Sequence, residues 1–572
     1  MDARPLVLIA GGYGVFGGRL ARLLAARGDL RVIVAGRSFE SAQSFCDALQ
    51  GRAEPLRFDR DEDPAAVLQS VRPWCVVDAA GPFQAYGVGG GDPYRLARAA
   101  LACGAHYLDL SDDAGFTAGI SMLDDVARST QRAAISGAST VPAISAAAVR
   151  SLCEGLTRID SIESVVLPGN RAPRGLSVMR AILAQVGRPL RLWRGNAWTQ
   201  VPGWSGLRRD GLALEDGTAV APRWSSYIGS PDLQLFPAAF GAHSVRFRAG
   251  LELSLLHLGL WMLGWLPRLR LMRSLEPWAR PLRWMADRFE RFGSDRGGMR
   301  VDVIGRDREG RAHRRTWTLI AERGEGPYVP ALPSACLIDR LLRGELAAGA
   351  RPCLVDLNLA DIEAASVVLP IRCGRQAAAI ETLYEGVMGP AAWSRLPAAV
   401  RDVHDLFDRR AFRGKARITG GANPLAWLLA RFMRFPPAIE RTPVRVTMER
   451  RPDGAETWRR EFGRHRFAST LSRRASDPRG RIRERFGPMS FLLALPVDES
   501  GLQMPLERGE WLGIPLPRWI TPRSETREFV DAQGRFRFDV DISLPGIGRV
   551  VRYEGWLVPE VDAALPAITT LG

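Results

Sequence analysis

The residues best suited to chemistry stand at the start of the chain, where glycines follow a short apolar run. Leu6 to Ala10 is apolar, and the segment Gly12-Tyr13-Gly14-Val15-Phe16-Gly17 has the spacing G-x-G-x-x-G. In this spacing, the first glycine permits a tight turn, the second lets a phosphate approach the backbone, and the third lets a helix pack close to a strand. The first amides of the helix can then bind a pyrophosphate. The residues predicted to do so are Gly11, Gly12, Gly14, Val15, Phe16 and Gly17.

The elements around these glycines predict an α/β fold with a doubly wound parallel sheet. Phe16, Leu20, Leu23 and Leu24 have helical spacing after the glycine turn. Strand-like apolar runs follow, and they alternate with helical patterns. These strands are expected at 6–10, 31–35, 55–59 and 75–83.

The end of the second predicted strand indicates which dinucleotide would bind. NAD enzymes carry an acidic residue there, which binds the ribose hydroxyls, whereas Arg37 and Ser38 occupy this position. An arginine suits a 2′-phosphate, so we expect NADP as the cofactor. Asp59 ends the third predicted strand, on the adenine side, and the fourth predicted strand ends in Ala80, Gly81 and Pro82.

Three further motifs make the pattern more specific. The segments "VVDAAGPFQAYG" (76–87), "ACGAHYLDLSDD" (102–113) and "SGASTVPAISAAAV" (136–149), with the opening glycines, resemble the saccharopine dehydrogenase (saccharopine reductase-like) NADP-binding family. Segments 293–305 and 326–337 resemble the later part of such chains, so the resemblance covers about residues 5–375. It implies a Rossmann-like domain that binds NADP, with the turn at Gly81 and Pro82 near the cofactor. It implies amine or keto chemistry only weakly.

The length of 572 residues predicts several domains. We expect a Rossmann domain at 1–150, an α+β substrate domain at 151–390, and a separate α+β domain at 391–572 that is rich in antiparallel strands. Alternating patterns at 442–471 and 534–559 support the last of these. It is similar to a C-terminal domain of unknown function found behind such NADP-binding modules. Its role is either structural or the binding of a lipid-like ligand in a curved sheet. The second alternative rests on the apolar segment 486–496 and on Trp511, Trp519 and Trp556.

A hydride transferase often needs a proton donor. The candidates are Tyr86, after the Gly-Pro turn, and His106 and Tyr107, on the predicted fifth strand. Alternation along that strand places His106 and Tyr107 on opposite faces. The only lysine is Lys415, which excludes a mechanism based on a Tyr-x-x-x-Lys pair. His243, with Arg246 and Arg248 nearby, is a weaker candidate for contact with an anionic substrate.

The amino-acid composition indicates which partners and which kinds of site the protein is expected to lack. The net charge is +16 and almost entirely arginine, which fits codon bias in a G+C-rich genome. The arginines are dispersed, so no nucleic acid is expected as a partner. Seven scattered cysteines without a C-x-x-C pair predict neither disulfides nor a metal site, and indicate a cytoplasmic protein.

The segment 251–292 allows three interpretations. Residues 251–266 are apolar and 268–292 are amphipathic and basic, with tryptophans among the arginines. The alternatives are a buried helix with a surface helix, a peripheral membrane contact, and a membrane span, for which about 16 residues are too few.

The sequence therefore predicts an NADP-dependent oxidoreductase that transfers hydride between nicotinamide and a small-molecule imine, carbonyl or double-bond substrate. A homodimer would be compatible with it. The alternative is a nucleotide-binding sensor without catalysis, coupled to a ligand-binding C-terminal domain at a membrane surface.

Overall fold

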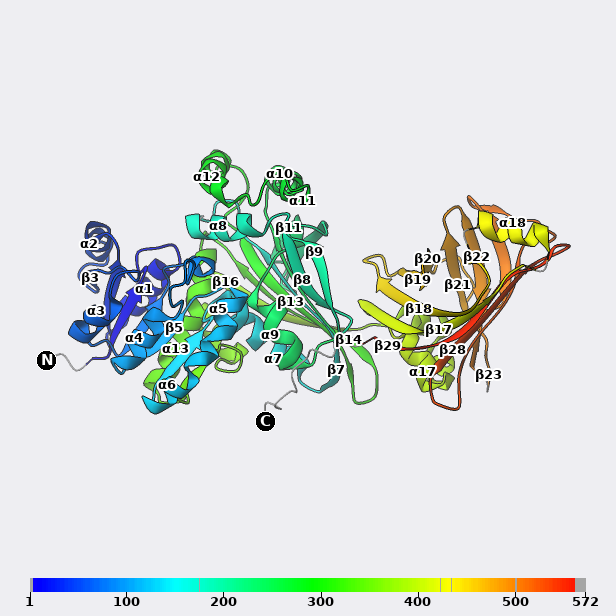
Figure 1. The fold of residues 1–572 in the computed structure, drawn as a ribbon. Helices are drawn as coiled ribbons and strands as arrows, with labels where there is room; N and C mark the ends of the chain where they lie inside the picture. Colours follow the sequence, from blue (N-terminus) through cyan, green and yellow to red (C-terminus); the bar gives the residue numbers. More distant parts are fainter. Residues whose placement is uncertain (1–3, 174, 422, 434, 499–500, 561–572) are drawn as a thin grey trace. The chain divides into compact units, whose positions relative to one another are not determined.

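A computed structural model describes residues 4–173, 175–421, 423–433, 435–498 and 501–560 (Figure 1). The chain divides into two compact units. The first comprises the N-terminal residues to Trp193 together with Thr199–Ala378, and the second comprises Arg194–Trp198 and the described residues from Ala379 onward. None of the described helices has the length and hydrophobicity needed to cross a membrane.

The first sheet of unit 1 is a seven-stranded parallel sheet in the order β15-β6-β5-β4-β1-β2-β3. The order of the first six strands is that of a dinucleotide-binding doubly wound fold, which confirms the predicted fold class. The strands are β1 (Leu6–Ala10), β2 (Arg31–Gly36), β3 (Glu54–Arg57), β4 (Cys75–Asp78), β5 (His106–Asp109), β6 (Ala133–Ser136) and β15 (Gly349–Pro352).

Helices cover both faces of this sheet (Figure 1). Several begin at a side chain that accepts a hydrogen bond from the first turn: Ser38 for α2, Asp63 for α3 and Asp113 for α5. The helices of this region are α1 (Gly17–Ala25), α2 (Phe39–Asp47), α3 (Pro64–Val71), α4 (Arg95–Ala102), α5 (Ala114–Gly119), α6 (Asp124–Ser129), α13 (Leu332–Leu342) and α14 (Leu359–Ser366). The next helix after α6, α7 (Ser145–Cys153), packs against the second sheet of the unit.

The structure differs from the expected elements in three places. The strand expected at 75–83 ends at Asp78, because the chain turns there toward Gly81, whose φ is +28°. The strand expected at 55–59 ends at Arg57, so Asp59 lies in a loop. The expected boundary at residue 150 falls within α7, and β15 adds a strand to the first sheet from far along the chain.

The second sheet of unit 1 is mostly antiparallel, in the order β10-β11-β12-β7-β13-β14-β16, with β8 and β9 joined beside β12. Its strands are β7 (Leu156–Leu167), β8 (Pro189–Arg194), β9 (Trp198–Pro202), β10 (Arg208–Ala213), β11 (Ala219–Tyr227), β12 (Ser244–Gly250), β13 (Gly297–Asp307), β14 (Ala312–Ala321) and β16 (Ile371–Ala379). Its helices include α8 (Leu176–Gln185), α9 (Pro231–Phe240), α10 (Ser254–Leu263), α11 (Trp265–Arg268) and α12 (Ala279–Asp287).

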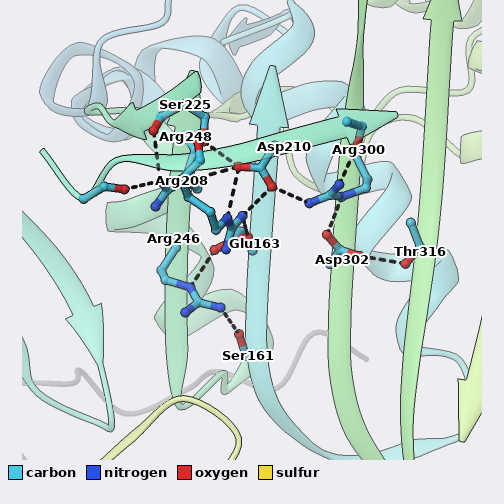
Figure 2. Close-up of polar contacts among 12 residues, drawn as sticks. Ser161, Glu163, Arg208, Asp210, Ser225, Arg246, Arg248, Arg300, Asp302 and Thr316 are labelled. Atoms are coloured by element: carbon cyan, nitrogen blue, oxygen red, sulfur yellow. Dashed lines mark hydrogen bonds and ion pairs between the residues drawn. The ribbon is translucent and has the colours of Figure 1, made fainter. Parts of the chain in front are cut away.

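Charged side chains from four strands of this sheet, β7, β10, β12 and β13, meet in one network (Figure 2). Glu163 on β7 is 5% exposed and pairs with Arg208 and with Arg246, whose Nε lies 2.9 Å from Oε2. Asp210 pairs with Arg208 at 2.8 Å and with Arg300 at 3.0 Å. Burial raises the pKa of Glu163, but Arg246 and Arg208 outweigh it, so that the pKa falls to about 2.

The same network contains Arg246 and Arg248, which the sequence analysis named with His243 as candidates for contact with an anionic substrate. Arg246 bonds Glu163, and Arg248 is 1% exposed and donates to Ser225. His243 lies beside Asp160, with Nδ1 3.5 Å from the carboxylate. These side chains therefore have partners within the sheet.

Unit 2 is built on one antiparallel sheet of thirteen strands, in the order β23-β24-β27-β28-β29-β17-β18-β19-β20-β21-β22-β25-β26, bent into an arc in Figure 1. The strands are β17 (Arg409–Thr419), β18 (Ile439–Arg450), β19 (Glu456–Phe462), β20 (His465–Ser472), β21 (Arg481–Phe486), β22 (Met489–Ala494), β23 (Val497–Asp498), β24 (Gly501–Gln503), β25 (Leu506–Trp511), β26 (Ile514–Pro515), β27 (Arg523–Val530), β28 (Phe536–Leu544) and β29 (Gly548–Pro559). Its helices are α15 (Leu383–Met388), α16 (Pro390–Arg395), α17 (Ala398–His404) and α18 (Pro424–Phe432). Alternate residues of β28, namely Phe536, Phe538, Val540 and Ile542, pack in or against its core.

The ion pairs of the second sheet give a stability prediction. Glu163→Gln leaves the guanidinium groups of Arg208 and Arg246 short of a buried partner, and such a loss costs about 3–5 kcal/mol. We expect a loss of that size in urea unfolding of the full chain. The control Glu54→Gln removes an ion pair with Arg31 in which the glutamate is 52% exposed, and should cost less than about 1 kcal/mol. Equal losses in the two variants would show that the network does not support the sheet.

Candidate dinucleotide site

The glycine turn after β1 lies at the carboxyl edge of the first sheet. The amides of Gly11 and Gly12 donate to the carbonyl oxygen of Ala35 on β2, at 2.8 and 3.1 Å. Gly11 has a φ of +75°, and a Cβ there would lie 2.8 Å from the carbonyl oxygen of Ala79. The turn therefore fills the space between the ends of β2 and β4, and a side chain at Gly11 would not fit.

The start of α1 offers unpaired backbone donors. Among the described residues, the amides of Val15, Phe16 and Gly17 have no hydrogen-bond acceptor. A Cβ at Gly17 would collide with the carbonyl oxygen of Gly11, whereas Gly14 is exposed and a Cβ there would meet only that oxygen, at 3.0 Å. A bare backbone with free amides at a helix start is typical of an anion-binding cradle.

The end of β2 is shaped by Tyr13 of the glycine motif. Its ring lies so close to Gly36 that any side chain there would collide with it, and its hydroxyl accepts from the amide of Ser38 at 3.2 Å. The Ser38 hydroxyl accepts from the amide of Ser41 and caps α2. Arg37 is exposed, and within the described part of the chain its side chain has no hydrogen bond or ion pair. Arg37 is thus free for a phosphate, while the side chain of Ser38 is already engaged.

The other predicted cofactor residues also lie at this edge. Asp59 follows β3 and accepts from the amide of Asp61 at 3.0 Å. Ala80, Gly81 and Pro82 follow β4, and the Ala80 amide donates to Asp78 at 3.0 Å. The sheet order thus places the segments after β1, β2, β3 and β4 side by side.

A buried polar cluster stands beside this turn. Tyr86 donates its hydroxyl to Asp78 Oδ1 at 3.3 Å, and the Arg60 guanidinium carbon lies 3.0 Å from the centre of the Tyr86 ring. Arg60 Nε is 3.9 Å from Asp78 Oδ2. Burial raises the pKa of Asp78 and of Tyr86, so that the phenol keeps its proton at neutral pH.

Asp109 ends β5 next to Asp78, to which it is directly paired in the sheet. Its Oδ1 accepts from the Gly137 amide and the Ser136 hydroxyl, each at 2.9 Å. Burial raises the pKa of Asp109 to about 7. Within the described residues, four buried atoms near this edge have no hydrogen-bond partner: Arg60 Nε, Asp78 Oδ2, Gln84 Oε1 and Asp109 Oδ2. Unsatisfied polar atoms beside an open cradle fit a site that binds a polar group.

The three predicted proton donors lie in different surroundings. Tyr86 lies at the carboxyl edge, as described. His106 begins β5 and lies at the opposite edge, where Nδ1 accepts from the Ala133 amide at 3.1 Å. Burial, with Arg132 nearby, lowers the pKa of His106 to about 4, so this ring is neutral. Tyr107 is 1% exposed and packs in the core of the sheet.

Sequence reasoning did not assign roles to Arg60, Asp78 or Asp109. The two aspartates end apolar strands, which is a signal for the carboxyl edge of a parallel sheet. Nothing in the sequence distinguishes Arg60, because the chain holds many arginines and the contact between Arg60 and Tyr86 joins distant segments. No group of three or more metal-ligating side chains occurs among the described residues.

Two known protein families match this chain, one in its N-terminal part and one in its C-terminal part. Residues 7–141 match the family model of the saccharopine dehydrogenase NADP binding domain, and residues 396–557 match a domain of unknown function, DUF4166. Among the curated protein sequences, none matches the chain.

Several solved structures resemble the fold. The saccharopine dehydrogenase (L-Glu forming) of Saccharomyces cerevisiae is 13% identical, with a TM-score of 0.48, over 65% of this chain and 100% of that one. Biliverdin reductase of Synechocystis sp. PCC 6803, solved with biliverdin and NADP+, is 12% identical, with a TM-score of 0.29, over 64% and 96% of the two chains. A probable dehydrogenase of Thermotoga maritima is 9% identical, with a TM-score of 0.30, over 63% and 93%.

The two family matches agree with the glycine turn and with the antiparallel second unit. The chain therefore carries a saccharopine dehydrogenase-type NADP-binding domain at residues 7–141 and a DUF4166 domain at residues 396–557.

Proposed function

We propose that the protein is an NADP-dependent oxidoreductase, which transfers hydride between nicotinamide and an imine, a carbonyl or an activated double bond. Two observations carry this proposal: among the described residues, the first amides of α1 have no acceptor, and the exposed Arg37 at the end of β2 has no hydrogen bond or ion pair. The match to an NADP-binding domain supports it.

Different residues of the cradle would bind different parts of the cofactor. The amides of Val15 to Gly17 would bind the pyrophosphate, and Arg37 would bind the 2′-phosphate. Asp59 would lie on the adenine side. The turn from Ala80 to Pro82 would lie along the path to the nicotinamide, which supplies or accepts the hydride when the cofactor is bound.

Tyr86 is the proposed proton donor. Its hydroxyl lies at the carboxyl edge of the sheet, and its raised pKa keeps the proton on the oxygen. Arg60 and Asp78 hold the ring and the hydroxyl in place. His106 and Tyr107 are less suited, because the first lies at the other edge and the second is enclosed by the core.

Replacement of Arg37 tests the cofactor assignment. Arg37→Ala removes one charged contact to the 2′-phosphate, so NADPH binding should weaken about tenfold to a hundredfold, while NADH binding changes little. Calorimetric titration of the purified full chain measures both. Arg52→Ala, an exposed arginine before β3 at the opposite edge, serves as the control and should bind NADPH like the wild type.

Two results would count against this assignment. One is a wild-type protein that binds NADH as tightly as NADPH. The other is an Arg37→Ala protein with unchanged NADPH affinity. Turnover distinguishes the oxidoreductase from a nucleotide-binding sensor, since a sensor binds NADPH but oxidises it with no member of a carbonyl and imine panel.

The raised pKa of Asp109 predicts a pH-dependent stability. The folded state holds a proton on this carboxyl up to about pH 7, whereas the unfolded chain releases it near pH 4, so wild-type stability falls as the pH rises between these values. Asp109→Asn removes that dependence. The difference in unfolding free energy, variant minus wild type, should therefore increase by about 2–3 kcal/mol from pH 5 to pH 8.

Urea unfolding at both pH values, read out by hydrogen exchange of β4 and β5 peptides, measures this gain. The control is Asp125→Asn, an exposed carboxyl in the first turn of α6, which should show no such trend. A constant difference between Asp109→Asn and the wild type would mean that Asp109 is ionised throughout.

A further inference from the structure

The DUF4166 domain encloses an apolar cavity that the proposed oxidoreductase site does not use. It has a volume of about 140 Å³ and lies against the inner face of the thirteen-stranded sheet. An apolar cavity of about 150 Å³ in another protein is large enough to bind benzene. Residues that line this one include Met433, Phe435, Phe467, Phe486, Phe491 and Phe538.

Part of the earlier expectation of a lipid-like cup corresponds to this cavity. Phe486, Met489, Phe491 and Leu493, from the segment 486–496, line it. The three tryptophans do not. Trp511 and Trp519 are 41% and 72% exposed, and Trp556 packs under Arg535.

One wall of the cavity carries a hydroxyl without a partner. Tyr384 on α15 is 0% exposed and lines the cavity, and its hydroxyl has no hydrogen-bond partner among the described residues. Its ring stacks on His404 with the ring centres 3.8 Å apart, and His404 Nε2 lies 2.5 Å from Glu528 Oε2. The ring is therefore held in place. A buried hydroxyl without a partner is costly, so a ligand that supplies one would gain affinity.

The other charges of the lining favour an uncharged ligand. Arg460 donates to Glu484 at 3.0 Å and to Ser469 at 2.7 Å, so its charge is already compensated. Glu528 also lines the cavity. Two carboxyl groups and one guanidinium thus face the ligand, and a carboxylate head group would meet repulsion without a free cation.

Apolar side chains are exposed next to the residues at one end of the cavity. Met433 and Phe435 follow α18, on which Leu425, Trp427 and Leu428 are 57–58% exposed. Met489 is directly paired in the sheet with Trp511, and Leu512 and Ile514 beyond it are 72% and 69% exposed. Figure 1 shows α18 at the opposite end of the sheet from α17, which ends at His404. This exposed apolar rim can hold a chain that extends out of the cavity.

We propose that the DUF4166 domain binds a neutral lipid-like alcohol. The hydroxyl of the ligand pairs with the Tyr384 hydroxyl, and its hydrocarbon chain runs past the phenylalanines toward α18. Three features of the described lining residues indicate this class of ligand: their apolar character, a buried hydroxyl without a partner, and the lack of a free cation for an anionic head group.

A series of straight-chain alcohols tests the proposal by calorimetry on the full chain. From 1-hexanol to 1-octanol, the affinity should rise about fourfold for each added methylene, because each one buries more apolar surface. Octanoate at pH 8 should bind at least tenfold more weakly than 1-octanol. Equal affinity for the two, or no binding of 1-octanol or 1-decanol, would overturn the proposal.

Two variants locate the binding. Tyr384→Phe keeps the stacked ring and removes the hydroxyl, so 1-octanol should bind about fivefold to tenfold more weakly. Met504→Trp should fill the cavity and abolish binding, with circular dichroism to show that the domain is folded. The control Tyr328→Phe, in unit 1, should bind like the wild type. Unchanged binding in Tyr384→Phe would place the alcohol elsewhere.

A second inference rests on a different surface, in unit 1. The segment 254–292 exposes nine large apolar side chains, and we call this region the α10–α12 surface. Leu255, Leu269 and Leu271 are 62–69% exposed, and Trp278 and Trp284 are 51% and 62% exposed. The others are Met262, Trp265, Met285 and Phe292. The helix expected at 251–266 breaks at Gly264, so it is not a span, and among its residues in α10 only His257 is buried.

The charges of the α10–α12 surface match an anionic partner. Seven arginines lie among the exposed apolar residues, and three acidic residues accompany them. The guanidinium groups of Arg268 and Arg288 lie over the rings of Trp265 and Trp284, at 4.9 and 4.3 Å. Tryptophans with arginines suit the boundary between lipid head groups and acyl chains.

We infer that the α10–α12 surface binds an anionic membrane from one side, without crossing it. In a sedimentation assay, the full chain should bind vesicles of phosphatidylcholine mixed with phosphatidylglycerol, and it should bind vesicles of phosphatidylcholine alone much less. Added salt should weaken binding, because the charge contribution is screened.

A triple substitution on this surface tests the site. Leu269→Ser, Leu271→Ser and Trp284→Ser change exposed residues, so the fold should persist, and vesicle binding should fall at least tenfold. The matched control changes Met122, Val367 and Val368, which are 75–82% exposed elsewhere in unit 1, to serine and should keep vesicle binding. Undiminished binding by the first variant, or loss only in the control, would overturn the inference.

Discussion

The cost of placing charge away from water governs all three sheets of this protein. An ionised group in a protein interior must be paired, or must hold a proton, for the fold to tolerate it. The second sheet uses pairing, since Glu163 is ionised between arginines. The first sheet uses protonation, since Asp109 titrates near neutrality where it ends β5. The DUF4166 domain uses both, because Arg460 is paired with Glu484 while burial raises the pKa of Glu456 to about 7.

The sequence predicted the parts of the structure that depend on neighbours in the chain. The glycine turn, the strand before it and the helix after it follow from residues within about twenty positions, and the structure has them there. The alternation at 534–559 likewise predicted β28 and β29. The end of β4 was placed five residues too late, because Ala79 to Phe83 continue the apolar run although the chain has already turned.

What the sequence could not predict are contacts between distant segments. Arg60 precedes α3 and Tyr86 follows β4, yet their side chains are in contact, and Glu163 meets Arg208 from another strand. In a chain with so many arginines, no spacing distinguishes these from the exposed ones. The cavity has the same origin, because Tyr384 comes from a helix before the sheet and Phe538 from near its end. The proposed cofactor residues, all within 11–82, were accessible to reasoning, whereas the polar cluster beside them was not.

The late strand β15 has a consequence for synthesis. It pairs with β6 only after residue 352 has been made, about two hundred residues after the other six strands. During that interval the nascent chain carries an unpaired edge on β6, and such an edge can join the strands of another molecule. The parallel sheet is therefore complete only once β15 has been synthesised. Pairing between such distant segments forms slowly, so the edge of β6 stays exposed for part of translation.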